Sequence, residues 1–297
     1  MDHYAVFGNP ISQSKSPWIH GEFARQTKQA LEYSAQFVEI DAFETDVQAF
    51  FAAGGSGLNV TVPFKERAWA MCDILSDIAR LTGAVNTLYL SSDGKLCGDN
   101  TDGHGLLRDL TNNHAEVLTG KSVLLLGAGG AVKGVLPALL AQKPASVTIA
   151  NRTVEKAVKI AQTYADKLSI AVYTYAELPK QPYDFVINGT SAGLQGELPP
   201  LPEQIVSAHT CCYDMIYGQG ETVFQQWAKQ RGAAQAIDGL GMLVEQAAQA
   251  FKVWRQCEPQ TAAVIKQLRE QLAQAKPLSS NNDSLCASFR STYTPAV

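Results

Sequence analysis

The sequence lacks several residue patterns that mark special classes of protein. None of the six cysteines forms a C-x-x-C pair, which indicates free thiols in a reducing, cytoplasmic compartment. The five histidines are scattered, and none lies at metal-ligand spacing from a cysteine or another histidine, so no metal is expected. No apolar run is long enough to cross a bilayer, and the first ten residues lack a signal-peptide pattern. We therefore expect no membrane partner.

Neither basic nor acidic residues are in large excess, with 24 Lys and Arg against 28 Asp and Glu. The net charge of −4 over 297 residues provides no basic field for a nucleic-acid backbone, so that class of partner is not expected. With 46% hydrophobic and 18% charged residues, the composition is typical of a globular protein. The chain is long enough for one large or two ordinary domains, each with a core of its own.

Strand-like and helix-like runs alternate along most of the chain, which predicts an α/β protein with parallel sheets. A first series of runs extends to about residue 104. A second series begins near Gly105 and contains a strand, a glycine-rich turn and a helix in succession at 121–142. Helical runs follow from Gly241. The last segment, 276–297, is polar, serine-rich and aperiodic, and it is expected to be disordered.

A glycine-rich turn follows the apolar run SVLLL and opens a helix. Its residues are Gly127, Ala128, Gly129, Gly130 and Ala131. Small side chains here let backbone amides and a helix N-terminus approach a pyrophosphate. Val132 takes the third glycine position of the dinucleotide-binding pattern G-x-G-x-x-G, and we expect it to alter helix–strand packing rather than phosphate contact. A tight turn without a ligand is the alternative interpretation, because a glycine loop alone is weak support.

The end of the next predicted strand bears on the choice between NAD and NADP. An enzyme for NAD usually has an acidic residue about 20 residues past the glycines, where it binds the ribose hydroxyls. Here the chain has Asn151, Arg152 and Thr153, with Lys156 one turn later. A guanidinium can bind a 2′-phosphate with paired hydrogen bonds, so NADP is favoured over NAD. Taken by itself, Arg152 would more often be a solvated loop residue.

A dehydrogenase also needs a group that transfers a proton at the alcohol oxygen. The cysteine and histidine ligands of a zinc-dependent dehydrogenase are missing, and none of the ten tyrosines belongs to the Tyr-x-x-x-Lys pattern of short-chain dehydrogenases. A lysine, histidine or carboxylate near the cleft remains. These absences direct attention to the lysine in the segment NVTVPFKE.

Lys65 follows a strand-like alternation and a proline. The alternation predicts Asn59, Thr61 and Lys65 on one face, opposite a face made of Val60, Val62 and Phe64. The proline suits the first turn of a helix, so Lys65 would lie near the positive end of a helix dipole, which disfavours the ammonium form. Most lysines are nevertheless solvated surface residues.

Eight short motifs together resemble one family. They are VFGNPISQSKSPWIH, GLNVTVPFKE, GAVNTL, GDNTDG, LLGAGGA, NRT, DMIY and DGLGMLVEQAA. They extend from residue 1 to about residue 275 and make the chain similar to the shikimate dehydrogenases, NADP-dependent enzymes of aromatic amino-acid biosynthesis. That family reduces 3-dehydroshikimate reversibly to shikimate.

The resemblance implies a substrate-binding α/β domain and an inserted, Rossmann-like, doubly wound NADP domain. The substrate-binding domain would comprise residues 1–104, completed by C-terminal helices at 239–275. The NADP domain would comprise residues 105–238. The active site would lie in the cleft between them, in a monomer or homodimer.

The resemblance also implies roles for individual residues. Lys65 and Asp102 would form the catalytic pair. The substrate would be bound by Ser14, Ser16, Asn59, Thr61, Asn86, Tyr217 and Gln246. The nicotinamide would contact Met215 and Gly239, and Asp77 would lie near the cofactor.

Four of these residues also have ordinary structural interpretations. Ser16 stands before a proline, as a helix N-cap does. Asp102 could form a turn, Met215 could fill the core, and Gly239 could serve a tight turn. Two rival functions also remain open at this stage. One is a quinate/shikimate dehydrogenase that prefers NAD, and the other is a dinucleotide sensor that keeps the fold without the chemistry.

Overall fold

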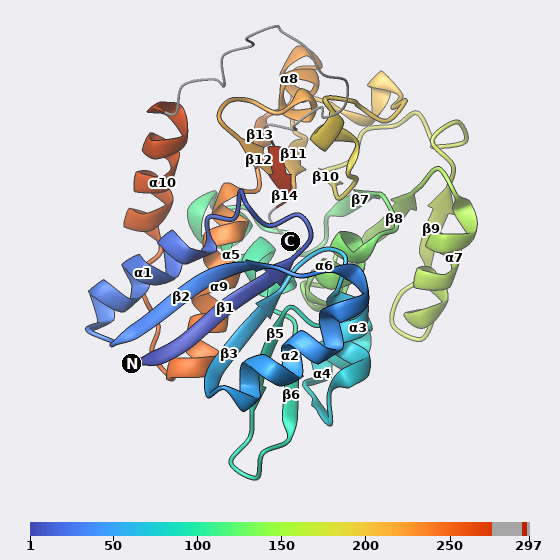
Figure 1. Cartoon of the computed structure of the whole chain (residues 1–297). Coiled ribbons are helices and arrows are strands. Elements are labelled where there is room, and N and C mark those ends of the chain that lie inside the picture. Colours follow the sequence, from blue (N-terminus) through green and yellow to red (C-terminus); the bar gives the residue numbers. More distant parts are fainter. Residues whose placement is uncertain (275–292, 296–297) are drawn as a thin grey trace, which may run out of the picture.

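The computed structural model describes residues 1–274 and 293–295 and is built on two six-stranded sheets with helices packed against them (Figure 1). The α/β class expected from the sequence is confirmed. No helix in these residues is both long and apolar enough to cross a bilayer. The same residues contain no group of three or more His, Cys, Asp or Glu side chains placed to hold a metal ion. The tail expected to be disordered, 276–297, lies outside the described residues except for the short strand at 293–295.

The first sheet is mixed and has the strand order β2-β1-β3-β5-β6-β4. Its strands are β1 (Asp2–Gly8), β2 (Leu31–Phe37), β3 (Gly55–Val60), β4 (Ile74–Leu75), β5 (Thr87–Leu90) and β6 (Leu96–Asp99). Strand β1 runs parallel to β2 and β3, whereas β5 runs antiparallel to β3 and β6. The helices packed on one face are α2 (Phe43–Ala52), α3 (Lys65–Met71) and α4 (Asp77–Thr82). The segments next to β3, β5 and β6 carry Lys65, Asn86 and Asp102.

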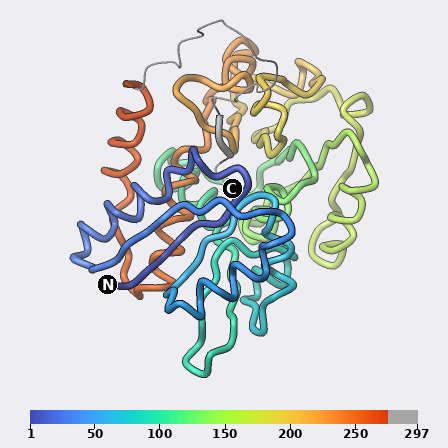
Figure 2. The backbone as a smooth tube through the Cα atoms, viewed as in Figure 1, coloured from blue at the N-terminus to red at the C-terminus, as the bar shows by residue number. Residues whose placement is uncertain are grey.

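The other face of the first sheet is covered by helices from both ends of the chain, α1 (Ser16–Thr27) and α9 (Leu240–Arg255). Helices α5 (Asp102–Arg108) and α10 (Ala262–Gln274) pack on α9. Figure 2 shows the orange C-terminal helices beside the blue N-terminal segment. The rings of Phe23 and Phe251 lie 5.7 Å apart, and Trp254 Nε1 donates a hydrogen bond to the carbonyl of Leu88 at 3.2 Å. Aromatic packing therefore joins α9 to α1, and the Trp254 hydrogen bond joins α9 to the first sheet.

The second sheet is parallel throughout and has the strand order β13-β11-β10-β7-β8-β9. Its strands are β7 (Ser122–Leu126), β8 (Ser146–Ala150), β9 (Ile170–Tyr173), β10 (Phe185–Asn188), β11 (Cys211–Asp214) and β13 (Gln235–Ile237). Its helices are α6 (Gly130–Ala141), α7 (Val154–Thr163) and α8 (Val223–Gln230). The strand order reverses between β7 and β10. In doubly wound sheets such a reversal opens a ligand crevice at the carboxyl ends of the strands.

Helix α5 lies where the two sheets meet. A side chain at Gly103 would lie 2.7 Å from Cβ of Ala138 on α6, and one at Gly105 would lie 2.7 Å from Cβ of Gln246 on α9. Glycine at both positions lets α5 pack closely against a helix from each side. The domain boundary expected at residue 105 falls inside this helix, so the division of the chain stays a prediction.

The remaining elements are short. They are β12 (Ile216–Gly218), β14 (Tyr293–Pro295), η1 (Ile40–Ala42), η2 (Asp109–Asn113), η3 (Ala192–Gln195) and η4 (Glu203–Ile205). Strands β12 and β14 form an antiparallel pair. Strand β12 follows β11 after one intervening residue, Met215.

Candidate active site

Lys65 is the first residue of α3 and follows a turn after β3. Strand β3 ends at Val60, and the Phe64 amide donates to the carbonyl of Thr61 at 3.0 Å as the chain turns. The strand alternation expected through Phe64 is therefore wrong beyond β3, because Val62 is 52% exposed instead of buried. The turn nevertheless places Lys65 at a helix N-terminus, and the residue is only 8% exposed.

Lys65 and Asp102 are in direct contact. Nζ of Lys65 donates to Oδ2 of Asp102 at 2.7 Å, and the two side chains are 10% and 1% exposed. Asp102 is the first residue of α5, so the partners come from different elements. A buried pair of this kind persists only when further hydrogen bonds offset the desolvation of both charges.

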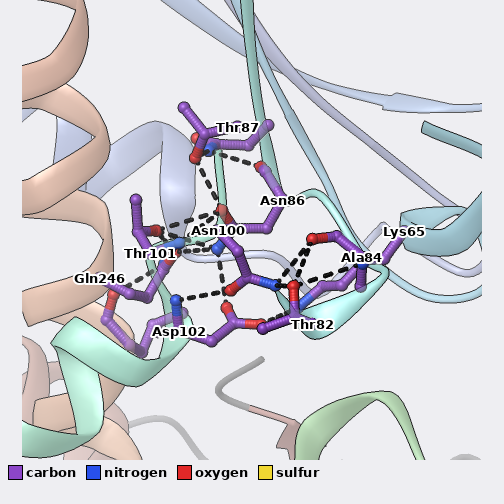
Figure 3. Close-up of polar contacts among 11 residues, drawn as sticks. Lys65, Thr82, Ala84, Asn86, Thr87, Asn100, Thr101, Asp102 and Gln246 are labelled. Carbon is purple, nitrogen blue, oxygen red and sulfur yellow. Dashed lines mark hydrogen bonds and ion pairs between the residues drawn. The ribbon is translucent and has the colours of Figure 1, made fainter. Parts of the chain in front are cut away.

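Asn86 supplies that further bond and links the pair to α9. Its Nδ2 donates to Oδ1 of Asp102 at 2.7 Å, and it also lies within hydrogen-bond distance of the Thr101 hydroxyl and of Oε1 of Gln246. Its Oδ1 accepts from the Thr101 amide and the Thr87 hydroxyl. Figure 3 shows these side chains converging from β5, α5 and α9. The network fixes the orientation of the Asp102 carboxylate.

The turn before α5 is formed by Asn100, not by Asp102. Oδ1 of Asn100 accepts from the amide of Asp102 at 3.1 Å, and its Nδ2 donates to the carbonyl of Ala84 at 3.0 Å. The turn-forming interpretation of Asp102 therefore has no support in the geometry. Its carboxylate is left for Lys65 and Asn86.

Ser14 and Ser16 lie at the N-terminus of α1. The N-cap residue of this helix is Lys15, without a side-chain cap, so the N-cap interpretation of Ser16 is wrong. Instead, the amide of Ser16 donates to Oγ of Ser14 at 3.3 Å. Ser16 is 8% exposed. Two hydroxyls thus lie together at a helix N-terminus, a favourable place for an anion.

Asn59 and Thr61 differ in how they are bound. The Asn59 side chain is engaged on both sides: Oδ1 accepts from the Tyr33 hydroxyl at 2.7 Å, and Nδ2 donates to the Asn86 carbonyl and the Thr87 hydroxyl. The Thr61 amide donates to the carbonyl of Phe7, and its methyl group would lie 2.5 Å from a Cβ at Gly8. The geometry favours Asn59 as a residue that holds its neighbours in place.

Three expected site residues approach from the other sheet and from α9. Tyr217 on β12 and Met215 directly before β12 are both buried. The Met215 amide donates to the carbonyl of Asn188, and Sδ of Met215 lies near Gly189 at the end of β10. Gln246 on α9 joins the Asn86 network, as described above.

The glycine-rich turn lies between β7 and α6, at the reversal of the strand order. Gly127 has a φ of +103°, and a Cβ there would lie 3.1 Å from the carbonyl oxygen of Gly189. Gly129 and Gly130 are exposed, and a Cβ on either would meet nothing within 4 Å. The start of α6 therefore borders open space, as a site for a pyrophosphate at a helix N-terminus requires.

Val132 is accommodated without distorting this turn. It is fully buried in the core, and a Cβ at Gly189 would lie 2.8 Å from Cγ2 of Val132. Gly189 thus provides the room that the valine needs. The expectation that Val132 acts on packing rather than on phosphate contact agrees with this position.

A cationic segment follows β8. Arg152, Thr153 and Lys156 are exposed, and Nδ2 of Asn151 donates to the carbonyl of Thr153 at 2.8 Å. Within residues 1–274, neither Arg152 nor Lys156 forms an ion pair with a carboxylate. These two cations, without ion-pair partners in this range, follow β8, which pairs with the strand before the glycine turn. Such a position suits a 2′-phosphate.

Two further expected cofactor residues have less distinctive positions. Gly239 is the N-cap of α9 with an ordinary φ of −78°, and its amide donates to the carbonyl of Ile216 at 3.0 Å. Asp77 begins α4, where it is exposed and pairs with Arg80 at 2.8 Å. Neither geometry requires a cofactor.

The sequence reasoning missed Thr101 and Asp214. Thr101 lies between Asn86 and Gln246; its place within the motif GDNTDG was the signal that could have found it. Asp214 is buried and accepts from Thr222, Asn188 and the Ile216 amide, which fixes the turn from β11 to β12. Burial raises the pKa of Asp214 to about 6 although these hydrogen bonds oppose the shift.

The fold and this site together define a class: an NADP-dependent oxidoreductase with a doubly wound cofactor sheet. Three family models match the chain. They describe the shikimate dehydrogenase substrate binding domain at residues 6–88, shikimate / quinate 5-dehydrogenase at 109–195 and the shikimate 5′-dehydrogenase C-terminal domain at 239–269. The chain belongs to the shikimate dehydrogenase family.

Individual relatives agree with the family models. The chain is 55% identical over 268 residues to the shikimate dehydrogenase (NADP(+)) of Alkalilimnicola ehrlichii, covering 90% of this chain and 98% of that one. It is 54% identical over 270 residues to that of Hahella chejuensis, covering 91% and 99%. A shikimate dehydrogenase solved in complex with NADP+ superimposes with a TM-score of 0.84 at 30% identity, covering 92% and 96%.

Proposed function

We propose that this protein catalyses the reversible, NADPH-dependent reduction of 3-dehydroshikimate to shikimate, a step of aromatic amino-acid biosynthesis. The observation that carries the proposal is the buried Lys65–Asp102 pair, held by Asn86 beside the N-terminus of α6. The names of the relatives that cover nearly the whole chain support this substrate and cofactor.

Lys65 is the group that we propose to carry the proton. Bound NADPH supplies the hydride for the carbonyl carbon. Both oxygens of Asp102 already accept hydrogen bonds, from Lys65 and from Asn86, whereas Nζ of Lys65 donates only to Asp102 among the described residues. An ammonium has three donors, so Lys65 keeps donors for the substrate oxygen. During reduction it protonates the developing alkoxide, and in the reverse direction the neutral amine accepts the hydroxyl proton. Asp102 orients the lysine.

The remaining polar residues around the pair bind the substrate in this proposal. Ser14 and Ser16 donate to its carboxylate at the N-terminus of α1, where the helix dipole also favours an anion. Hydroxyl groups of the ring are bound by Thr61, Asn86, Tyr217 and Gln246. Asn59 holds Asn86 in place through the hydrogen bond from its Nδ2 to the Asn86 carbonyl.

The cofactor is bound across the other side of the cleft. Amides of residues 127–131 at the N-terminus of α6 bind the pyrophosphate. Arg152 and Lys156 bind the 2′-phosphate, and Asn151 and Thr153 shape the same turn. Met215 and Gly239 line the nicotinamide, and Asp77 lies at the edge of the site.

We also propose that residues 1–104 and 239–275 move as one domain against residues 105–238. Some of the polar contacts that cross between the two sides lie at or near the surface. Examples are the ion pair of Lys133 and Glu66 at 2.7 Å and the hydrogen bond from the Tyr164 hydroxyl to the Leu81 carbonyl at 3.0 Å. Such contacts can break and re-form as a cleft opens and closes. A cytoplasmic location and a monomeric or homodimeric state remain predictions.

The test is an assay of the purified protein with shikimate and with quinate, each with NADP+ and with NAD+. We expect NADPH to form from shikimate, with NADP+ preferred over NAD+. A clear preference for NAD+ would contradict the assignment of Arg152. No reduced cofactor with any combination would instead support the dinucleotide sensor, a function that the intact Lys65–Asp102 pair opposes.

A further inference from the structure

Asn100 lies in the turn between β6 and α5, two residues before Asp102. It is only 4% exposed, and a Cβ at Gly134 of α6 would lie 3.6 Å from its Nδ2. Figure 3 shows its side chain between Asp102 and the segment that carries Thr82 and Ala84. The asparagine is thus enclosed by the protein, and we do not expect it to touch the substrate.

The amide group of Asn100 binds a backbone group on each side. Its Oδ1 accepts from the amide of Asp102 at 3.1 Å, and its Nδ2 donates to the carbonyl of Ala84 at 3.0 Å. Nδ2 also lies 3.4 Å from the hydroxyl of Thr82. A carboxamide can accept on one side and donate on the other, whereas an ionised carboxylate can only accept. Asn100 therefore joins the start of α5 to residues 82–85.

Residues 82–85 also hold the backbone of Lys65. The amide of Val85 donates to the carbonyl of Lys65 at 2.9 Å. Three hydrogen bonds and the peptide between Ala84 and Val85 thus connect the backbone of Lys65 to that of Asp102. The only side chain in this path is that of Asn100. The contact of Lys65 Nζ with the Asp102 carboxylate closes the path into a ring.

Asn86 holds a different part of Asp102. Its Nδ2 donates to Oδ1 of the carboxylate at 2.7 Å. Asn86 therefore orients the carboxylate, whereas Asn100 fixes the backbone from which that carboxylate extends. Because the two asparagines hold different atoms, Asn86 does not replace the bond from Asn100 to Ala84.

We propose that Asn100 is a positioning residue that sets the distance between the backbones of Lys65 and Asp102. The fixed distance keeps Nζ of Lys65 in one place relative to the substrate oxygen. Without the bond to Ala84, the start of α5 can shift against residues 82–85, and Nζ moves with the carboxylate to which it is bonded. A displacement of about 1 Å at a reacting group can cost about a hundredfold in rate. The inference rests on the proposed function, since it takes Lys65 to carry the proton.

Asn100→Ser separates the bond to Ala84 from the turn. A serine hydroxyl can still accept from the amide two residues further on, but it is too short to reach Ala84. The Ala84 carbonyl keeps a hydrogen bond from the Thr82 hydroxyl at 3.0 Å, so it is not left unpaired. We expect a folded protein whose kcat is about tenfold lower, with the KM of shikimate and the Kd of NADPH within about twofold of the wild type. Steady-state rates and fluorescence titration with NADPH measure these quantities.

A double variant tests whether Asn100 acts through Lys65. In Lys65→Ala the proposed proton donor is absent, so adding Asn100→Ser should change the remaining kcat by less than about twofold. A general loosening of the site would instead lower the rate in both backgrounds, because hydride transfer still requires an ordered substrate.

Gln225→Ala is the matched control for Asn100→Ala. Gln225 of α8 is 8% exposed, and its amide group also joins two backbone groups. Its Oε1 accepts from the amide of Thr222, and its Nε2 donates to the carbonyl of Ala236, both at 3.0 Å. We expect both variants to melt at a lower temperature than the wild type, and only Asn100→Ala to lose kcat.

Two results would overturn the inference. One is a folded, NADP+-binding Asn100→Ser protein with the kcat of the wild type, which would limit Asn100 to forming the turn. The other is an equal loss of kcat from Asn100→Ser with and without the Lys65 side chain. A wild-type protein that binds NADP+ but forms no NADPH from shikimate would instead refute the proposed function itself.

Discussion

The proposed substrate side of the site is a buried network of hydrogen bonds, whereas the proposed cofactor side is exposed to solvent. Lys65, Asn86 and Asp102 are at most 8% exposed, and each is bound to another member of the group. On the proposed cofactor side, a Cβ at Gly130 would meet nothing within 4 Å, and Arg152 is exposed without a carboxylate partner in residues 1–274. The polar groups of the proposed substrate side bond to one another, whereas those of the proposed cofactor side are left for a ligand.

The difference has a physical reason. Proton transfer requires side chains that are already oriented when the substrate arrives, and buried hydrogen bonds provide that orientation. A charged cofactor must enter and leave, so exposed amides and exposed cations are suited to bind its phosphates. Changes on the substrate side should therefore reduce kcat, and changes on the cofactor side should reduce affinity for NADPH.

The largest effect is expected from Lys65→Ala. Loss of the proton donor should reduce kcat about 10³-fold, while the Kd of NADPH stays near that of the wild type. Steady-state rates and fluorescence titration with NADPH measure the two quantities. Lys133→Ala, which removes the partly exposed lysine paired with Glu66, is the control and should keep most of the activity. A large loss of NADPH affinity in Lys65→Ala would contradict the comparison of the two sides.

Arg152→Ala tests the cofactor side. Without the guanidinium, the Kd of NADPH should rise between about tenfold and about a hundredfold, whereas that of NADH, which has no 2′-phosphate, should change little. Lys159→Ala, on the exposed face of α7 beyond Lys156, is the control for charge on this helix. Equal losses of affinity for NADPH and NADH would contradict the proposal that Arg152 binds the 2′-phosphate.

Gly134→Ala is a change on the proposed cofactor side that should affect the substrate side. Gly134 belongs to the cofactor helix α6, but a Cβ there would lie 3.0 Å from Oδ2 of Asp102, the oxygen bonded to Lys65. We expect kcat to fall about tenfold with little change in NADPH affinity, because the carboxylate has no room to retreat. Gly130→Ala, on the same helix but in open space, should change NADPH affinity and not kcat. If Gly134→Ala resembled Gly130→Ala, the close contact would have no catalytic meaning.

Asp214→Asn should have the smallest effect on catalysis and a clear effect on stability. The pKa of Asp214 in the folded protein, about 6, lies above its unfolded value of 3.8. Between about pH 4 and pH 6 the folded protein holds a proton that the unfolded chain releases, so stability from this group is lost as pH rises. The free energy of unfolding of the wild type relative to Asp214→Asn should fall by roughly 3 kcal/mol over that window. Urea unfolding at several pH values measures it, and parallel pH profiles would contradict the assignment.

Much of the fold could be predicted from the sequence because local patterns specify it. Alternating strand and helix runs predicted the α/β class, and the turn at 127–131 predicted where the cofactor helix begins. The local pattern failed at NVTVPFKE, since a strict alternation would have buried Val62, whereas the chain turns after Val60. The motifs that resemble a known family supplied Asp102, Asn86 and Ser16, which no local pattern singles out.

The sequence by itself determined the fold class, the glycine turn, the cationic segment after β8 and the candidacy of Lys65. These depend on residues close together in the chain. Only the tertiary structure decided which side chains are bonded to one another. Lys65 and Asp102 are 37 residues apart, and Tyr33 and Asn59 are 26 apart. Contacts at such separations arise from the packing of whole elements, and the burial that makes them strong exists only after that packing is complete.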